Sequence, residues 1–294
     1  MPTNGQQDQV REPVRILGAK SRPFHRIAIA PNYGHASIRF GEITMLRVRQ
    51  WLFAVSFLVS GACFASTACP NFFVSGSNPS LDSSLTTRTT EVCHTEYVLL
   101  ASGVTKGPLY SAQHLTAAQV EGADSISRTG SFHQETGIPT ADRSQSSDYT
   151  NSGFDRGHMT PAGDESTIDS EKESFSMANV VPQDHKLNTG EWAKIEAQVR
   201  DLATQLGEVY VVTGPAFDPD NIPTIGKDAV AVPAYTWKAV YEPGKGAAAY
   251  LCTNDDTITC DVVSLNDIKT MSGVDPFPSL SSSMKANPIS LPLP

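Results

Sequence analysis

The sequence lacks a long apolar run, is poor in cysteine and has no excess of basic side chains. A helix that spans a bilayer needs about 20 consecutive apolar residues, and the main apolar stretch here, residues 51–59, is far shorter. The 294 residues include 22 Lys and Arg against 31 Asp and Glu, a formal charge of −9. This balance argues against a protein that binds nucleic acid tightly over a broad basic surface. An enzyme that contacts a few phosphates remains compatible with it.

Two common arrangements of catalytic or metal-binding residues are also missing. There is no G-x-S-x-G segment, which counts against a serine hydrolase with a nucleophile elbow. There is no C-x-x-C pair, and no two cysteines have the spacing of zinc ligands. A cysteine hydrolase is disfavoured because the cysteines are better explained as disulfides.

Residues 45–68 have the three parts of a secretory signal peptide. Two arginines precede the apolar stretch, and small residues follow it, with Ala65 and Ala68 as cleavage candidates. This order predicts export to the periplasm or the extracellular space. A buried core helix is the alternative interpretation. A lipoprotein signal at Cys63 fits poorly, because no leucine-like residue stands three positions before it.

A signal peptide that begins at residue 45 implies that Met45 is the true start. Residues 1–44 are polar and lack apolar periodicity, so we expect a non-native or unstructured extension without a function. Without residues 1–68, which hold eight basic and three acidic side chains, 14 Lys and Arg face 28 Asp and Glu, about −14 in charge. Any nucleic-acid site must then be a local patch assisted by a cation.

An even number of cysteines remains after the predicted signal peptide, which contains Cys63. In an oxidising compartment, four cysteines favour two disulfides. Three pairings are possible. Proximity in the sequence favours Cys69 with Cys93 and Cys252 with Cys260.

Residues 69–280 contain no internal repeat and no long linker, which predicts one catalytic domain. Residues 281–294 are rich in Ser and Pro and are expected to form a flexible tail. Short apolar runs indicate strands, and the two around Pro233 are expected to form a strand pair. The predicted strands are residues 97–101, 209–213, 229–232, 235–241 and 247–251.

Apolar residues recur at steps of three and four between Gly190 and Leu206, which predicts a helix. Asn188 or Thr189 is a suitable N-cap, and Gly207 is a suitable stop. A second, shorter helix is expected over residues 265–271. Strands before and after a helical middle indicate an α+β fold.

The segment Phe154–Pro161 contains the first candidate for chemistry, His158. It stands beside a glycine in a charged, turn-prone stretch, so we expect it to be accessible. Its ordinary pKa of about 6.5 suits proton transfer at neutral pH. A single histidine is nevertheless more often structural or solvated than catalytic.

A second candidate group lies at the start of the predicted helix. Asn188 precedes Glu196 by eight residues, so on one continuous helix the two lie within roughly 80° of each other around the axis. Arg200 follows Glu196 by four residues and shares its face. The alternatives are a plain N-cap for Asn188 and a simple ion pair between Glu196 and Arg200.

At these residues the sequence resembles the DNA/RNA non-specific endonuclease family, a branch of the ββα-metal (His-Me finger) nucleases. The resemblance covers roughly residues 95–280 and includes several motifs in matching order and spacing. It implies a central mixed or antiparallel sheet with helices and a ββα-metal motif. The motifs are D-R-G-H at 155–158, N-x-x-P-Q at 179–183, L-N-x-G-x-W at 187–192, Arg128, T-G-P at 213–215 and P-A-Y-T-W-K at 233–238.

The resemblance implies a role for each matching residue. His158 would be the general base that activates water. Asn188 would be the one protein ligand of Mg²⁺, although Mn²⁺ or another divalent cation is compatible. Arg128 would bind the scissile phosphate.

The remaining matches imply supporting roles. Asn179 and Glu196 would order the metal-bound waters and the surroundings of the base. Arg156 and Arg200 would hold phosphate or the local structure. His185 departs from the family pattern, and we interpret it as a surface residue and not as a second base.

These roles fit the needs of phosphodiester hydrolysis. A neutral imidazole, a hard cation and an arginine can supply the activated water and neutralise the charge on the phosphate. No step requires a 2′-hydroxyl, and phosphate contacts carry no base information. The predicted substrates are therefore DNA and RNA, cut without sequence preference. A secreted binding or inhibitor protein on an inactive nuclease scaffold is the alternative, and the sequence leaves open whether the protein is a homodimer.

Overall fold

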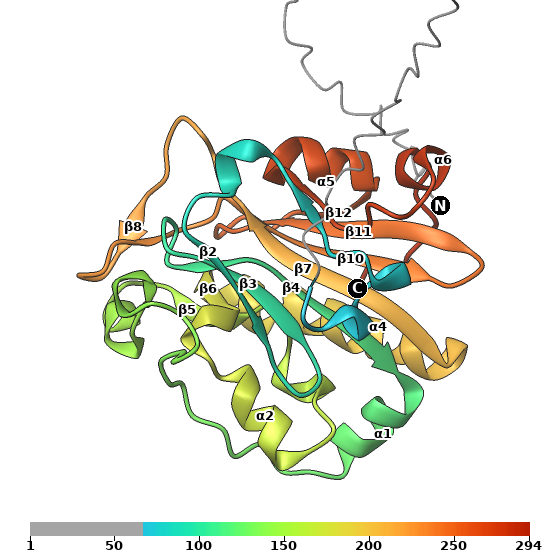
Figure 1. The fold of residues 1–294 in the computed structure, drawn as a ribbon, viewed down its shortest axis with the longest axis horizontal. Coiled ribbons are helices and arrows are strands. Elements are labelled where there is room, and N and C mark those ends of the chain that lie inside the picture. The colour runs from blue at the N-terminus through green and yellow to red at the C-terminus, as the bar shows by residue number, and fades with distance from the viewer. Residues whose placement is uncertain (1–66) are drawn as a thin grey trace, which may run out of the picture. The chain divides into compact units, whose positions relative to one another are not determined.

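In a computed structural model of the protein, which describes residues 67–294, a seven-stranded antiparallel sheet forms the centre (Figure 1). The proposed extension and nearly all of the proposed signal peptide lie outside the described residues. The strand order is β12-β11-β10-β7-β4-β3-β2. The bounds are β2 Thr89–Cys93, β3 Val98–Ser102, β4 Gly107–Thr116, β7 Glu208–Ala216, β10 Tyr235–Glu242, β11 Gly246–Thr253 and β12 Cys260–Val263.

Apolar side chains cover both faces of this sheet, because successive residues of a strand point to opposite sides. Val211 packs into a cluster with helix α4 (Glu191–Leu206), whereas its neighbour Val212 packs into a cluster with helix α5 (Leu265–Ser272). Figure 1 shows α5 on the opposite side of the sheet from α1 (Ala117–Asp124) and α2 (Ile168–Ser174). The fold is therefore α+β, as predicted.

Helix α4 confirms the predicted apolar periodicity. Trp192, Ile195 and Val199 are buried along one face, and Gly207 ends the helix with a φ of 90°. The predicted N-cap is wrong, because Gly190 occupies that position and Asn188 belongs to a separate short helix, α3 (His185–Thr189). A side chain at position 190 would place its Cβ 2.5 Å from the carbonyl oxygen of Lys186, so the break requires glycine.

Shorter elements lie around the sheet. A two-stranded antiparallel ribbon, β5 with β6, precedes α3 and gives the expected β-β-α order. The remaining short elements include β1 Ser80–Leu81, β5 Asp155–His158, β6 Val180–Gln183, β8 Thr224–Ile225, β9 Val230–Ala231, β13 Val274–Asp275 and α6 Ser282–Ala286.

The predicted strands are found, but one predicted pairing is wrong. Strand β10 pairs with β7 and β11, whereas β9 pairs with β8. The backbone on the β9 side of Pro233 is already bonded elsewhere, since Ala231 donates to the carbonyl of Thr105 and Val232 to that of Pro223. The second predicted helix is confirmed as α5.

Residues 281–294, expected to form a flexible tail, contact the sheet in the structure. After α6, the backbone amide of Ile289 donates to the carbonyl of Ala247 at 3.2 Å. The hydroxyl of Tyr250 donates to the carbonyl of Pro292 at 3.0 Å, and Leu291 is buried among apolar residues of the α4 side. The apolar residues of the segment therefore dock it on the sheet despite its Ser and Pro content.

Both favoured cysteine pairs are disulfides. Cys69–Cys93 ties the beginning of the described chain to β2, and Cys252–Cys260 joins β11 to β12. Within residues 67–294, no helix is long and apolar enough to span a membrane.

Candidate active site

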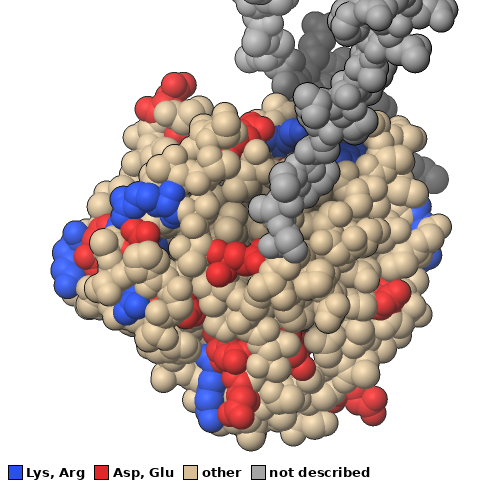
Figure 2. Space-filling model, in the orientation of Figure 1, with Lys and Arg blue, Asp and Glu red and all other residues tan. Residues whose placement is uncertain are grey.

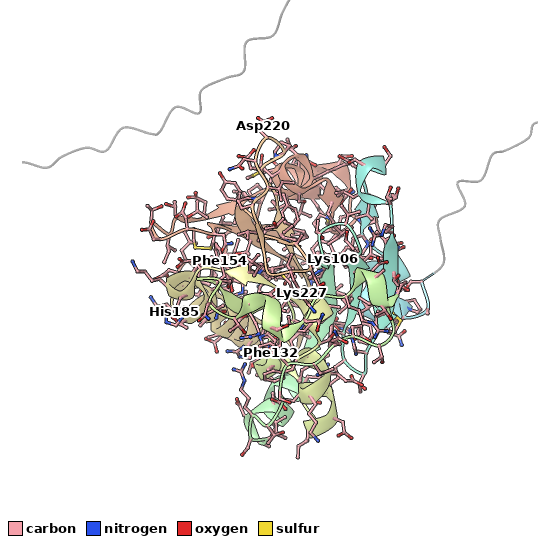
Figure 3. All side chains as sticks on the ribbon, turned by 90° about the vertical axis from the view of Figure 1, so that its left-hand side faces the viewer. Lys106, Phe132, Phe154, His185, Asp220 and Lys227 are labelled. Atoms are coloured by element: carbon pink, nitrogen blue, oxygen red, sulfur yellow. A yellow bond between two sulfur atoms is a disulfide. The ribbon has the colours of Figure 1, made fainter. Side chains whose placement is uncertain are left out.

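A cavity of about 500 Å³ lies beside β5, α3 and α4. It draws its lining from segments that are far apart in the sequence. Figure 3 labels Phe132 of this lining, and His185 of the neighbouring helix α3. Six residues proposed from the sequence line it: Arg128, Arg156, His158, Asn188, Glu196 and Arg200.

His158 is the last residue of β5 and lies opposite Val180 of β6. Only 8% of it is exposed, so the expectation of an accessible loop position is wrong. The ring packs against Phe132, with ring centres 5.2 Å apart, and against Phe175 at 4.9 Å. Its Nε2 atom is buried and has no hydrogen-bond partner among the described residues. The imidazole is therefore held by strand pairing and by aromatic contacts.

This environment favours the neutral form of the imidazole. Burial, and secondly the positive charge of Arg128, lower the pKa of His158 to about 3. The ring is then uncharged throughout the neutral range, which keeps a nitrogen available to accept a proton. Activity is therefore not expected to fall at pH 6.5 through the protonation of this ring, as its ordinary pKa had suggested.

Asp155, at the other end of β5, connects Asn188 to the strand. The side-chain nitrogen of Asn188 donates to Oδ2 of Asp155 at 2.9 Å. Nδ1 of His185 donates to the same oxygen at 2.8 Å, and the His185 side chain is 71% exposed, as expected for a surface residue. With its nitrogen bonded to Asp155, Asn188 has its amide oxygen to offer to the cavity that it lines.

Glu196 lies on α4, while Asn188 is on α3, so the single helix that was to place them together does not exist. The two residues nevertheless line the same cavity. Burial raises the pKa of Glu196, and the charge of Lys238 opposes that rise, with a net value of about 7. Lys238 is buried and donates to Oγ1 of Thr213 at 2.8 Å and to the carbonyl of Met159 at 3.2 Å.

Three arginines contribute guanidinium groups to the cavity lining. Arg200 donates to Asp164 at 2.9 Å, and Arg156 donates to the carbonyl of Ser146 at 2.6 Å. Arg128 is exposed, lies over the ring of Phe175 at 4.9 Å, and has no ion-pair partner in residues 67–294. Figure 2 shows acidic and basic side chains intermingled on the face in view, without a broad basic surface.

Asn179 is the proposed residue that does not line the cavity. It is fully buried, and its amide bonds only to backbone. The Oδ1 atom accepts from the amide of Thr160 at 3.0 Å, and Nδ2 donates to the carbonyls of Thr160 at 2.9 Å and Ser174 at 2.8 Å. These contacts fix the chain that follows His158, and none of them supports a direct role in ordering water in the cavity.

Four further residues shape the site, although no role was predicted for them from the sequence. Asp155 belongs to the D-R-G-H segment, so its place in the motif was a usable signal. Lys238 likewise ends the P-A-Y-T-W-K segment, and its charge acts on Glu196 in the folded protein. Phe132 and Asp164 come from other segments and contact the proposed residues only after folding. The positions of these two residues carried no local pattern that could have identified them.

The donor atoms at the cavity suit a hard divalent cation. The amide oxygen of Asn188 and the carboxylates of Asp155 and Glu196 belong to its lining. Oxygen ligands are the ones that Mg²⁺ prefers, and Mg²⁺ commonly keeps several of its waters. The four cysteines in the described residues are disulfide-bonded and supply no thiolate ligand for a softer metal.

Residues 76–283 match the model of a protein family described as DNA/RNA non-specific endonuclease. The chain is 29% identical over 210 residues to the mitochondrial nuclease EXOG of Homo sapiens, covering 64% of this chain and 57% of that protein. It is 34% identical over 198 residues to Nuclease C1 of Cunninghamella echinulata var. echinulata, covering 59% and 77%. The chain spans about half the length of the mitochondrial EXOG proteins that it matches.

A solved structure is similar as well. A chain in the crystal structure of the EndoG/EndoGI complex superposes with a TM-score of 0.61 and 29% sequence identity. The match covers 66% of this chain and 88% of that one. The overall fold is thus similar to that of a solved structure at 29% sequence identity.

Proposed function

Since the chain belongs to the DNA/RNA non-specific endonuclease family, we propose that it hydrolyses phosphodiester bonds in DNA and RNA without sequence preference. One observation carries the proposal. A buried, neutral histidine, an asparagine amide, two carboxylates and three guanidinium groups all line one cavity of about 500 Å³. Together these groups can activate water and neutralise the negative charge that develops on the phosphate.

In this proposal His158 is the general base. The low pKa of about 3 keeps the ring neutral at physiological pH, so it can accept a proton from the attacking water. A group with so low a pKa is a weak base, so the attacking water must be more acidic than bulk water for the proton transfer to proceed. Phe132 and Phe175 hold the ring in place while this happens.

Asn188 would hold the divalent cation, which we propose to be Mg²⁺, through its amide oxygen. When bound, the cation supplies charge neutralisation at the phosphate and acidifies water. Asp155 fixes the Asn188 amide through its nitrogen. Glu196, with a pKa raised to about 7, gives the same cavity a carboxylate whose ionised form would order water near the cation.

The arginines would bind the phosphate and stabilise its developing negative charge. Arg128 is exposed and unpaired among the described residues, so it can reach the scissile phosphate. Arg156 and Arg200 are held by Ser146 and Asp164 and present fixed charges. Phosphate contacts give no base readout, and nothing in this set of groups needs a 2′-hydroxyl.

Export to the periplasm or the extracellular space belongs to the same proposal. The apolar stretch of residues 45–68 supports it, and the two disulfides favour an oxidising compartment.

The test is a cleavage assay with purified protein on single- and double-stranded DNA and RNA, each with Mg²⁺ and with excess EDTA. We expect all four substrates to be cut at rates of similar order, and EDTA to abolish cleavage. Confinement to RNA, or cleavage at one defined DNA sequence, would contradict the proposed substrate range. No cleavage of any substrate would favour the inactive-scaffold alternative.

A further inference from the structure

Two donors on helix α3 converge on one oxygen of strand β5. The Nδ1 atom of His185 lies 2.8 Å and the Nδ2 atom of Asn188 lies 2.9 Å from Oδ2 of Asp155. His185 and Asn188 are three residues apart, so they project from the same side of the helix. The carboxylate of Asp155 therefore ties α3 to β5 at two points.

The helix itself is short, so these ties matter for its position. It has five residues and is capped by Asp184, whose carboxylate accepts from the amides of Lys186 and Leu187. Gly190 separates it from α4. A helix of this length has little stability of its own. Its orientation depends on the contacts that its side chains make with the surrounding structure.

The direction of the Asn188 amide depends on the same carboxylate. Because Asp155 takes the amide nitrogen, the amide oxygen is the atom left for the cavity. A carboxylate bonded to one donor can rotate and exchange partners with water. The second donor, His185, restricts that rotation and holds Oδ2 where Asn188 needs it. His185 does not line the cavity, so any effect on the site must pass through Asp155.

We propose that His185 is a positioning residue for the cation site, acting through Asp155 to fix the amide of Asn188. The inference rests on the proposed function, in which Asn188 holds the cation. The proposed role of His185 differs from that of an ordinary exposed ion pair. Such a pair contributes little to stability and would leave the cation affinity unchanged. Removal of an outer-shell partner of a ligand typically weakens metal binding about 10- to 100-fold.

The test is calorimetric titration of the full chain with Mg²⁺ alone, without nucleic acid. His185→Ala should raise the Kd for Mg²⁺ about tenfold, at the lower end of that range because His185 is exposed. His185→Gln keeps a donor and should recover most of the affinity. Lys186→Ala, at the exposed neighbouring position, removes a full charge from the same helix and should stay within about twofold of the wild type. Cleavage by His185→Ala should recover at saturating Mg²⁺.

A double-mutant cycle checks the route through Asp155. Asp155→Asn should weaken Mg²⁺ binding more than His185→Ala, and adding His185→Ala to it should cause no further loss. An unchanged Kd in His185→Ala, or an additive loss in the double variant, would overturn the inference. If the wild type itself binds no Mg²⁺, the proposed function fails together with this inference, whereas normal binding by wild type and variant alike overturns the inference alone.

Discussion

The burial of His158 predicts a measurable loss of stability in mild acid. In the unfolded chain its pKa is about 6.5, whereas burial and Arg128 lower the pKa to about 3 in the folded protein. The unfolded state therefore binds the proton more tightly. The resulting loss in the free energy of unfolding is absent above pH 6.5 and grows as the pH falls from 6.5 toward 3. At pH 5 it amounts to about 2 kcal/mol, from 1.36 kcal/mol for each pH unit below 6.5.

The perturbation that isolates this effect is His158→Asn, which replaces the titrating ring by a smaller, non-titrating polar side chain. Urea unfolding of both proteins at pH 8, 7, 6 and 5, with EDTA present, gives the free energy of unfolding. Loss of the ring's contacts with Phe132 and Phe175 should destabilise the variant at pH 8. Between pH 8 and pH 5 the difference should shift by about 2 kcal/mol in favour of the variant.

Comparison of variant with wild type cancels the titration of other groups to first order. Glu135 is one such group, because the nearby His94 and a hydrogen bond from the amide of Gly137 outweigh its burial and lower its pKa to about 2. That carboxylate contributes stability that is lost as the pH falls below about 4.5 in either protein. Parallel pH profiles for the two proteins, differing by a constant, would refute the buried neutral histidine and the account of the base built on it.

Three further predictions concern the cation, the carboxylate and the phosphate contacts. Asn188→Ala should raise the Mg²⁺ concentration for half-maximal cleavage at least tenfold, as measured by titration of initial rates. An unchanged Mg²⁺ requirement would remove Asn188 as the ligand. Lys238→Met removes the buried positive charge that lowers the pKa of Glu196, so the acid limb of the pH–rate profile should move to higher pH. A limb that stays in place would mean that Glu196 does not control it. Added salt should inhibit cleavage only weakly. For each tenfold rise in salt concentration, the logarithm of the affinity for duplex DNA falls by about 0.9 per phosphate contact, and the contacts are few. A steep slope would indicate a broad basic surface.

Local patterns predicted those parts of the fold that depend on neighbouring residues. Spacing predicted the apolar face of α4 and its stop at Gly207, and among three possible cysteine pairings proximity favoured the two disulfides that the structure contains. The start of α4 could not be predicted in this way. A side chain at position 190 would collide with the backbone of Lys186, and this conflict becomes visible only in three dimensions.

Strand β4 was missed, although it lies inside the sheet. Its residues 107–116 include Ser111 and Gln113, which break the apolar pattern of a buried strand. Both side chains are buried because partners far along the chain bond to them, Thr160 to Ser111 and Asp164 to Gln113. A pattern of apolar residues cannot reveal buried polar pairs of this kind.

The sequence indicated which residues lie at the candidate site, but it did not indicate the surroundings of those residues. Six of the seven proposed residues line the cavity, because the motifs identify residue types in a fixed order. The burial of His158, the pKa of Glu196 near 7 and the link from His185 to Asp155 arise from packing between separate segments. These features determine how the groups can act, and they can be recognised only in the folded structure.

The most direct test of the central claim is the turnover of His158→Ala on plasmid DNA at saturating Mg²⁺. A general base contributes about 10²- to 10⁴-fold to the rate, so kcat should fall by at least 10²-fold while Mg²⁺ affinity stays near that of the wild type. The far-ultraviolet circular dichroism spectrum should confirm that the variant is folded. Retention of more than a tenth of the wild-type kcat in the folded variant would contradict the assignment of His158 as the base.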